Sequence, residues 1–346
     1  MATENLNSNR LKSLFLLMML LALALSWVGM RDIPGTPYTG YQVSSDYRVV
    51  QMNPRGPAAL AGLRLDDMIT EVNGTPTEQL YQLSRQAEPR IGDEVNLKVL
   101  RAGMSYEFRF KRIPLPAQQA TLTWIYQITA VFMLVGGLLV FWKKPRKETL
   151  LFYLSNYCIA LGLMTPPHLE SFLLRNLVAL NSLLFLILGL AFFLHLTVVF
   201  PRPKLSVLET PVEIFIYLPV PVMAAFYLGF GLFQPMADLR LNQTLHYLFG
   251  LSVLYCLGLA LAAVAHSYWT ARRTVAAQHW TWLLIGSLFG LLPPAVLVFR
   301  DSFLPKLPLL GSSYYNLMIL FAYFTFSWAL LREEPREDSD LFQKAA

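Results

Sequence analysis

The chain contains five histidines, the residues best suited to metal binding and proton transfer near neutral pH. They are His168, His195, His246, His266 and His279. No pair of them has the spacing of an HExxH zinc site, in which two histidines one helical turn apart bind the metal. The sequence also contains no GxSxG motif and no pair of membrane-embedded aspartates. We therefore expect no proteolysis by this chain.

Three of the histidines lie near the same end of apolar runs. His195, His266 and His279 could in principle converge on a haem or a metal ion, because ionisable residues inside apolar spans are candidates for function. One alternative function is therefore a membrane redox or metal enzyme that uses these three residues. The other interpretation makes them neutral hydrogen-bond partners, and on it we expect no metal, no cofactor and no enzymatic activity.

The two cysteines and the basic residues do not indicate further chemistry. Cys158 and Cys256 both lie inside apolar runs, so they form no disulfide framework and no CxxC site. The formal net charge is +6, but the basic residues form short clusters beside apolar runs, where they orient helices in a bilayer. We expect a lipid bilayer as a partner and no nucleic acid.

The composition is that of an integral membrane protein. Hydrophobic residues make up 55% of the 346 residues and charged residues only 14%. The mean hydropathy is +0.44. These values exceed what a water-soluble protein tolerates.

Eight mostly apolar runs are candidates for helices that cross the hydrocarbon core of a bilayer, which takes about 20 residues, and the third of them is short and polar at its start. They comprise residues 13–30, 121–142, 150–164, 177–200, 212–233, 245–269, 280–299 and 314–331. The sequence therefore predicts an α-helical polytopic membrane protein with about eight transmembrane helices. A small α+β domain is expected in the long segment between the first two.

Basic clusters alternate between the two ends of these runs. Arg10 and Lys12 precede the first run, and the clusters KKPRKE, PRPK and ARR follow the second, fourth and sixth. Because cytoplasmic loops are enriched in lysine and arginine, both termini are predicted to be cytoplasmic. The segment between the first two runs then faces outside. This holds whether the first run is a retained anchor, which its unbroken apolar stretch favours, or a cleaved signal peptide.

The segment between the first two runs has the pattern of a small folded domain. AALAG indicates a short helical turn that ends at Gly62, where a left-handed cap is expected. The NG pair at residues 73–74 predicts a tight turn, and the AG pair at residues 102–103 predicts the turn of a hairpin. Residues 77–87 have the pattern of a helix.

The stretch GPAALAGLRLDDMITEVNG resembles the signature of bacterial PDZ domains of the envelope type. It has the Pro-Ala pair, the Ala-Gly-Leu step, the acidic turn and the strand that ends in Val-Asn-Gly. The resemblance covers residues 38–111. Asp67 matches the acidic position of the family, whereas Asp66 stands where a glycine is usual, so we expect a slightly altered turn.

The resemblance implies that an extended peptide adds to an exposed sheet edge. In the family, a loop before the edge strand presents backbone amides to a terminal carboxylate, and YTGY stands at that place, with Gly40 permitting close approach. The implied peptide-binding residues are Tyr38, Thr39, Gly40, Tyr41, Gln42 and Val43 on the loop and strand, and Leu80, Leu83, Ser84 and Ala87 on the opposite helix. Two other interpretations remain open. The apolar members of this set can be plain domain core, and the groove can be a rigid spacer that binds nothing.

The stretch HLTVVFPRPK resembles a segment of the multi-span input modules of competence-type bacterial sensor histidine kinases. In these modules a histidine late in one span precedes a Phe-Pro pair and basic residues, and some carry a PDZ-like domain between the first two spans. The chain ends in the acidic stretch LREEPREDSDLFQKAA, which is too short for catalytic domains. The resemblance therefore implies an input module that acts on a separate output protein.

The expected organisation has five parts. They are a cytoplasmic N-terminus at residues 1–12, a transmembrane anchor at 13–30, an extracytoplasmic PDZ-like domain at 36–112, a seven-helix transmembrane bundle at 121–331 and an acidic cytoplasmic tail at 332–346. We expect a non-enzymatic sensor or adaptor of the bacterial inner membrane. It would bind an extracytoplasmic peptide or protein C-terminus and signal to a cytoplasmic partner. A scaffold for an envelope protease or a secretion assembly is the main alternative.

Overall fold

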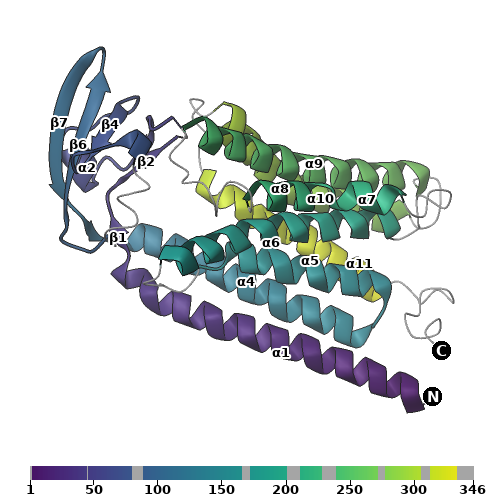
Figure 1. Cartoon of the computed structure of the whole chain (residues 1–346). Helices are drawn as coiled ribbons and strands as arrows, with labels where there is room; N and C mark the ends of the chain where they lie inside the picture. Colours follow the sequence, from purple (N-terminus) through teal and green to yellow (C-terminus); the bar gives the residue numbers. More distant parts are fainter. Residues whose placement is uncertain are drawn as a thin grey trace.

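The computed structural model of the chain describes residues 2–44, 46–79, 89–165, 172–200, 211–227, 239–271, 277–304 and 312–332. The described residues are mostly helical, and a small β-rich domain lies at one end of a bundle of long helices (Figure 1). This small domain comprises residues 37–114 and is inserted between helices α1 (Ala2–Asp32) and α4 (Ala117–Lys143). The prediction of a small domain between the first two apolar helices is therefore confirmed.

Six helical segments of the described chain are long and apolar enough to cross a membrane. They are Arg10–Gly35, Ala117–Lys143, Asn181–Val199, Thr244–Thr270, Trp280–Phe303 and Tyr314–Arg332. The first two belong to α1 and α4. The others belong to α6 (Phe172–Val199), α9 (Leu239–Ala271), α10 (Ala277–Phe303), and η4 (Ser312–Met318) with α11 (Ile319–Arg332).

The expected number of eight spans is not confirmed. The third expected span is α5 (Lys147–Leu163), whose 17 residues make a helix of only about 25 Å, shorter than a hydrocarbon core of about 30 Å. The fifth is divided into α7 (Pro211–Tyr217) and α8 (Pro219–Phe226). The division falls at Leu218, next to a proline that cannot continue the backbone hydrogen bonds of a helix.

Helix α5 lies inside the bundle and packs most extensively against α6 and α4. Its polar side chains have partners there: the hydroxyl of Ser155 donates a hydrogen bond of 2.8 Å to the carbonyl of Gly189 in α6, and the Asn156 amide donates to the carbonyl of Phe152 at 2.7 Å. Polar side chains buried among apolar helices need such partners, because no water satisfies them there.

The chain enters and leaves the bundle at the same end. Helix α1 begins and α11 finishes at the end opposite the small domain, and α4 runs from the small domain to that far end (Figure 1). The basic stretch that follows α4 therefore lies at the end where α1 begins.

The small domain contains a four-stranded antiparallel sheet in the order β5-β4-β6-β7. Its strands are β4 (Met68–Val72), β5 (Thr75–Pro76), β6 (Glu94–Arg101) and β7 (Met104–Lys111). Strand β6 alternates as its sequence predicts, since Val95, Leu97 and Val99 are buried. These side chains form the domain core together with Val49, Ala58, Leu63, Ile69 and Phe110.

The turns that the sequence predicts are present. Asn73 and Gly74 have φ angles of 52° and 78° between β4 and β5, and Ala102 and Gly103 have φ angles of 49° and 82° between β6 and β7. Gly62, with a φ of 102°, follows the short helix α2 (Pro57–Leu60) as its left-handed cap. Local sequence therefore decides these reversals.

Two smaller strand pairs complete the small domain. Strand β2 (Tyr41–Val43) pairs with β3 (Val49–Met52), and β1 (Pro37–Tyr38) pairs with β8 (Ile113–Pro114). The second pair extends the domain slightly beyond the expected boundary at residue 112. The helix expected at residues 77–87 begins as the 3-10 turn η2 (Thr77–Gln79), and its remaining residues, like the acidic tail from residue 333, lie outside the described residues.

Candidate functional site

The loop between β1 and β2 is held in place by its carbonyl groups. The Gly40 carbonyl accepts a hydrogen bond of 2.8 Å from the Asn53 amide, and the Thr39 carbonyl accepts one of 3.2 Å from the Ala58 amide. Gly40 has a φ of +89°, and a Cβ there would lie 2.9 Å from the Cα of Gly56. Only glycine fits this conformation and this close contact, as the sequence predicts for a loop that receives a ligand.

The amides of the same loop remain available. Neither the Thr39 amide nor the Gly40 amide donates a hydrogen bond to any residue that the structure describes. Successive unpaired backbone N–H groups form a concavity that binds anions. The Thr39 and Gly40 carbonyls thus accept hydrogen bonds from Ala58 and Asn53, while the two amides have no partner among the described residues and can bind a carboxylate.

Strand β2 continues from this loop and has an open edge. It pairs with β3 on one side, in the register Tyr41 with Met52 and Gln42 with Gln51. On its other side no strand pairs with it within the described ranges. Gln42 and Val43 are exposed. An extended peptide can therefore add to β2 through main-chain hydrogen bonds.

The opposite wall of the expected groove is not described. Leu80, Leu83, Ser84 and Ala87 all lie outside the described residues, so their assignment stays a prediction. The structure brings together the other six predicted residues, Tyr38, Thr39, Gly40, Tyr41, Gln42 and Val43, as one continuous loop and strand.

Tyr41 follows this loop and packs against the core of the small domain. Its ring contacts Phe110 of β7 edge to face, with the centroids 6.3 Å apart. Burial raises the pKa of the Tyr41 hydroxyl, and the nearby charge of Arg112 opposes that rise. Arg112 lies between β7 and β8, where its backbone amide donates to the Asp93 carbonyl and its carbonyl accepts from the Gly92 amide.

Arg112 is a residue that sequence reasoning missed. Its Nε atom is buried and has no hydrogen-bond partner among the described residues. A buried donor without a partner is costly unless a ligand or water satisfies it. In the sequence Arg112 is a basic residue two positions after Phe110, and Tyr41, whose hydroxyl its charge affects, is 71 positions earlier in the chain.

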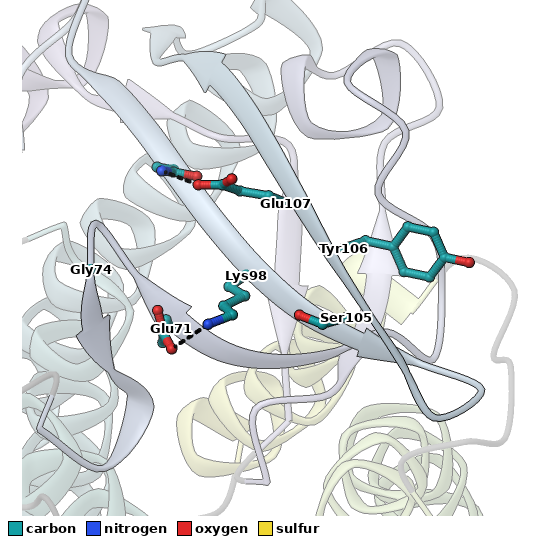
Figure 2. A pocket seen from close by; sticks show the side chains of 7 residues that line it. Glu71, Gly74, Lys98, Ser105, Tyr106 and Glu107 are labelled. Atoms are coloured by element: carbon teal, nitrogen blue, oxygen red, sulfur yellow. Dashed lines mark hydrogen bonds and ion pairs between the residues drawn. The ribbon is translucent and has the colours of Figure 1, made fainter.

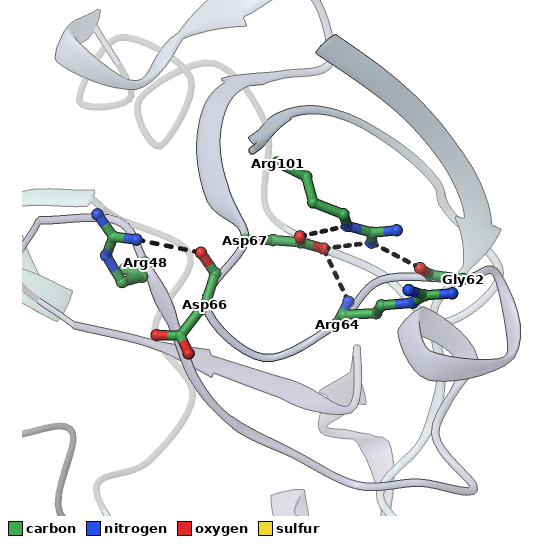
Figure 3. Close-up of polar contacts among 6 residues, drawn as sticks. All are labelled: Arg48, Gly62, Arg64, Asp66, Asp67 and Arg101. Carbon is green, nitrogen blue, oxygen red and sulfur yellow. Dashed lines mark hydrogen bonds and ion pairs between the residues drawn. The ribbon is translucent and has the colours of Figure 1, made fainter. Parts of the chain in front are cut away.

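The acidic turn before β4 is held by polar contacts of Asp66 and Asp67 (Figure 3). Asp67 is only 1% exposed; its carboxylate accepts hydrogen bonds from Arg101 Nε and Nη2, both at 2.7 Å, and from the Arg64 amide at 2.8 Å. The hydrogen bond to Asp67 raises the pKa of Arg101, against the opposing effect of burial. Asp66 has a φ of +68°, the left-handed conformation that a glycine adopts without strain.

A second depression lies on the sheet face away from the core (Figure 2). Its volume is about 340 Å³, and it is lined by Glu71, Gly74, Asn96, Lys98, Ser105, Tyr106 and Glu107. Its charged groups already have partners: Lys98 Nζ lies 3.0 Å from Glu71 Oε1, and Asn96 Nδ2 donates to Glu107 Oε1 at 2.7 Å. Sequence reasoning did not find this depression. Because these charged groups are already paired, they are less available to hydrogen-bond a ligand than the amides of the loop at Gly40.

The three histidines proposed for a metal or redox site have different surroundings. His195 of α6 is buried, with Nδ1 2.9 Å from the Tyr217 hydroxyl and Nε2 3.8 Å from Glu213 Oε1, both on α7. His266 is exposed on α9. The side chain of His279 lies outside the described residues. Among the described residues, no group of three or more His, Cys, Asp or Glu side chains is arranged to hold a metal ion.

Comparison with known proteins identifies one part of the chain. Residues 48–101 match the family model of the PDZ domain. No curated protein matches the chain. The resemblance of the membrane part to sensor kinase input modules therefore has no support from a relative. The matched segment runs from the residue before β3 to the last residue of β6, and both the loop at Gly40 and strand β2 lie before it in the chain. The chain thus carries a PDZ domain at residues 48–101, next to helices suited to a lipid bilayer.

Proposed function

We propose that this protein is a non-enzymatic membrane adaptor whose PDZ domain binds the C-terminus of a peptide or protein. The observation that carries the proposal is the pair of unpaired amides at Thr39 and Gly40, placed where the open edge of β2 begins. A terminal carboxylate accepts hydrogen bonds from these amides, and the preceding peptide residues extend along β2.

Arg112 and Tyr41 complete the carboxylate subsite in this proposal. The guanidinium nitrogen of Arg112, which has no hydrogen-bond partner among the described residues, supplies a positive charge near Tyr41, the residue that follows Gly40. Hydrogen bonds between charged groups are stronger than those between neutral groups, so this charge favours a free C-terminus over an internal segment. The partly buried ring of Tyr41 gives the last ligand side chain an apolar surface.

The proposed location is the bacterial inner membrane, with the PDZ domain outside and both termini in the cytoplasm. The support is the distribution of basic residues along the bundle. Arg10 of α1 and Lys143 of α4 are both far from the PDZ domain along their helices, at the end where the chain begins (Figure 1). Such residues concentrate on the cytoplasmic side of bilayers. Labelling of an exposed Ser105→Cys variant in intact cells by an impermeant maleimide tests this, and protection of that cysteine until lysis would overturn the assignment.

Binding is tested with the full chain in lipid nanodiscs and a library of peptides with randomised C-termini. Each selected peptide is compared with the same peptide carrying a C-terminal amide. We expect the amide to bind at least about tenfold more weakly, because it loses charge-assisted hydrogen bonds. Equal binding of acid and amide, or no selected peptide at all, would overturn the proposal.

Two matched arginine variants distinguish a specific role of Arg112 in the carboxylate subsite from the effect of removing any positive charge from the domain. Arg112→Gln should weaken the free-acid peptide by about tenfold and leave the amide unchanged. Arg109→Gln removes the same charge from an exposed position of β7, where the side chain is 66% exposed and pairs with Glu107 at 3.5 Å, and should have little effect. A similar loss in both variants would show that Arg112 has no specific role.

The partner that receives the signal is part of the same proposal. Gentle crosslinking in native membranes, followed by purification and mass spectrometry, identifies proteins bound to the bundle. A cytoplasmic signalling protein that is lost when the chain ends at residue 331 would establish a sensor with a separate output. An envelope protease or secretion component, retained without the tail and lost with Gly40→Val, would establish a scaffold instead.

A further inference from the structure

Tyr38, at the start of the ligand loop, is hydrogen-bonded to a transmembrane helix. Its hydroxyl oxygen accepts a hydrogen bond of 2.7 Å from the side-chain amide of Gln119, in the first turn of α4. The same oxygen accepts a second one of 3.1 Å from the side-chain amide of Asn53. One phenol oxygen therefore joins the PDZ domain to the second membrane helix.

Asn53 connects this oxygen to the carboxylate loop. Its backbone amide donates to the Gly40 carbonyl at 2.8 Å, while its side chain donates to Tyr38. Its side-chain oxygen accepts a hydrogen bond of 3.0 Å from the Arg55 amide, which fixes the orientation of the side chain. The Gly40 carbonyl is thus linked through two hydrogen bonds to the Tyr38 hydroxyl, and a third hydrogen bond links that hydroxyl to Gln119.

The two helices that flank the PDZ domain in sequence meet at this same place. Helix α1 leads through the 3-10 turn η1 (Ile33–Gly35) into β1, and β8 leads into α4. Tyr38 pairs with Ile113, and the Leu115 amide donates to the Thr36 carbonyl at 3.1 Å. The relative position of α1 and α4 is therefore tied to the strand pair that begins the ligand loop.

We propose that Tyr38 is a positioning residue that couples occupancy of the carboxylate loop to the relative position of α1 and α4. This inference rests on the proposed peptide binding and specifies how that binding is regulated and read out. A carboxylate bound by the Thr39 and Gly40 amides acts on the two peptide units on either side of Thr39, which adjoin the unit whose carbonyl Asn53 holds. The ligand changes the helices to the extent that it binds one arrangement of them more tightly. The same coupling makes the arrangement of α1 and α4 influence peptide affinity.

The experiment measures the distance between α1 and α4 in the full chain in nanodiscs. Nitroxide labels are attached to Trp27→Cys and Ile128→Cys, two positions with exposed side chains, 70% and 51% respectively. The native cysteines, both buried, are replaced by Cys158→Ala and Cys256→Ala. The probe is the free-acid peptide that binds most tightly, and its C-terminal amide is the control.

Two conservative variants remove the connection without removing the binding groups. Tyr38→Phe deletes the hydroxyl and keeps the ring, and Gln119→Met keeps the length of the side chain and deletes its donor. Tyr106→Phe is the matched control, since the Tyr106 hydroxyl lies on exposed β7 with only Met104 sulfur at 4.0 Å. The double variant Tyr38→Phe/Gln119→Met should resemble Tyr38→Phe alone, because the hydroxyl that Tyr38→Phe removes is the acceptor of the Gln119 hydrogen bond.

The free acid should change the label distance in the original chain and in Tyr106→Phe, and the amide should not. In Tyr38→Phe and Gln119→Met, the peptide should still bind within about tenfold of its original affinity, the net worth of one hydrogen bond, but the distance should stay at its peptide-free value. This inference is overturned if the peptide still changes the label distance in Tyr38→Phe. It is also overturned if the peptide binds the original chain without changing the label distance. Either result leaves the proposed function intact. Failure of the original chain to bind any free-acid peptide overturns both.

Discussion

Arg101, at the end of β6, and Asp67 form a bidentate ion pair, with Nε–Oδ1 and Nη2–Oδ2 distances of 2.7 Å each. Arg101 Nη2 also donates to the Gly62 carbonyl at 2.9 Å, so the pair ties the end of β6 to the cap of α2. The guanidinium lies 5.2 Å and 5.3 Å from the ring centres of Tyr106 and Phe108. A buried carboxylate is thus matched by one planar cation that is itself held by aromatic rings.

Replacement of this carboxylate should destabilise the PDZ domain. Asp67→Asn leaves the partly buried guanidinium of Arg101 without its counter-charge, which typically costs about 3 kcal/mol. Hydrogen exchange of the β6 and β7 amides in the full chain measures the loss of protection. Glu71→Gln is the control, because its pair with Lys98 is largely exposed and is worth about 0.5 kcal/mol. Equal losses in the two variants would contradict this account.

Asp66→Gly should stabilise the same domain. Asp66 has a φ of +68°, a conformation in which a residue with a Cβ is strained. Its side chain is not needed to hold Arg48, since Arg48 Nη1 donates to the Asp66 backbone carbonyl at 3.2 Å. We expect a gain of about 0.5 kcal/mol, measured by urea unfolding followed through amide protection. Ser105→Gly, in the extended strand β7, should instead lose about 1 kcal/mol, and a loss in both variants would refute the strain at Asp66.

Acid should weaken the β2–β3 hairpin through Asp46. Partial burial opposes ionisation of Asp46, but hydrogen bonds from the Ser44 hydroxyl and nearby amides, together with the charge of Arg48, lower its pKa below the ordinary 3.8. A lowered folded-state pKa gives stability that is complete above pH 3.8 and is lost as the pH falls through the lowered value. The original chain should be more stable than Asp46→Asn, and this difference in free energy should shrink over that interval. It is measured from the protection factors of the β2 and β3 amides, corrected for intrinsic exchange. An advantage that is constant with pH would exclude this role.

Gly189 should be intolerant of a methyl group where α5 and α6 meet. A Cβ there would lie 2.8 Å from the Ile159 backbone nitrogen and 3.0 Å from the Ser155 carbonyl oxygen, so the two helices would have to separate. Small residues permit such close helix packing in membranes. Gly189→Ala should cost about 2 kcal/mol, measured by thermal unfolding in detergent. Gly258→Ala in α9, where a Cβ meets nothing within 4 Å, should be neutral or stabilising; similar melting of the two variants would speak against a tight α5–α6 contact.

Features that depend on near neighbours in the chain were predictable from the sequence. The turns at residues 73–74 and 102–103 follow from glycine next to a residue that can adopt positive φ. The position of Gly40 before an edge strand, the cap at Gly62 and the inward residues of β6 follow in the same way from local pattern. Six of the expected spans follow from apolar length alone.

The number of spans could not be counted by apolar length. Residues 150–164 and 212–233 are as apolar as a span requires, but helix length and helix continuity also depend on packing and on proline positions. Helix α5 is short and lies among its neighbours, and the helix that begins at Pro211 is divided at Leu218. Apolar composition therefore indicates burial in lipid or in protein without distinguishing the two.

The sequence by itself determined that the chain combines apolar helices with a PDZ domain, because both are encoded by local spacing and by residue types with restricted backbone conformations. Only the tertiary structure placed Arg112 near Tyr41, Arg101 on Asp67 and Gln119 on Tyr38. The residues of each pair are separated by 34 to 81 positions in the chain. Such contacts arise when strands and helices with their own local preferences pack into one core, and no local pattern specifies which distant side chains then meet.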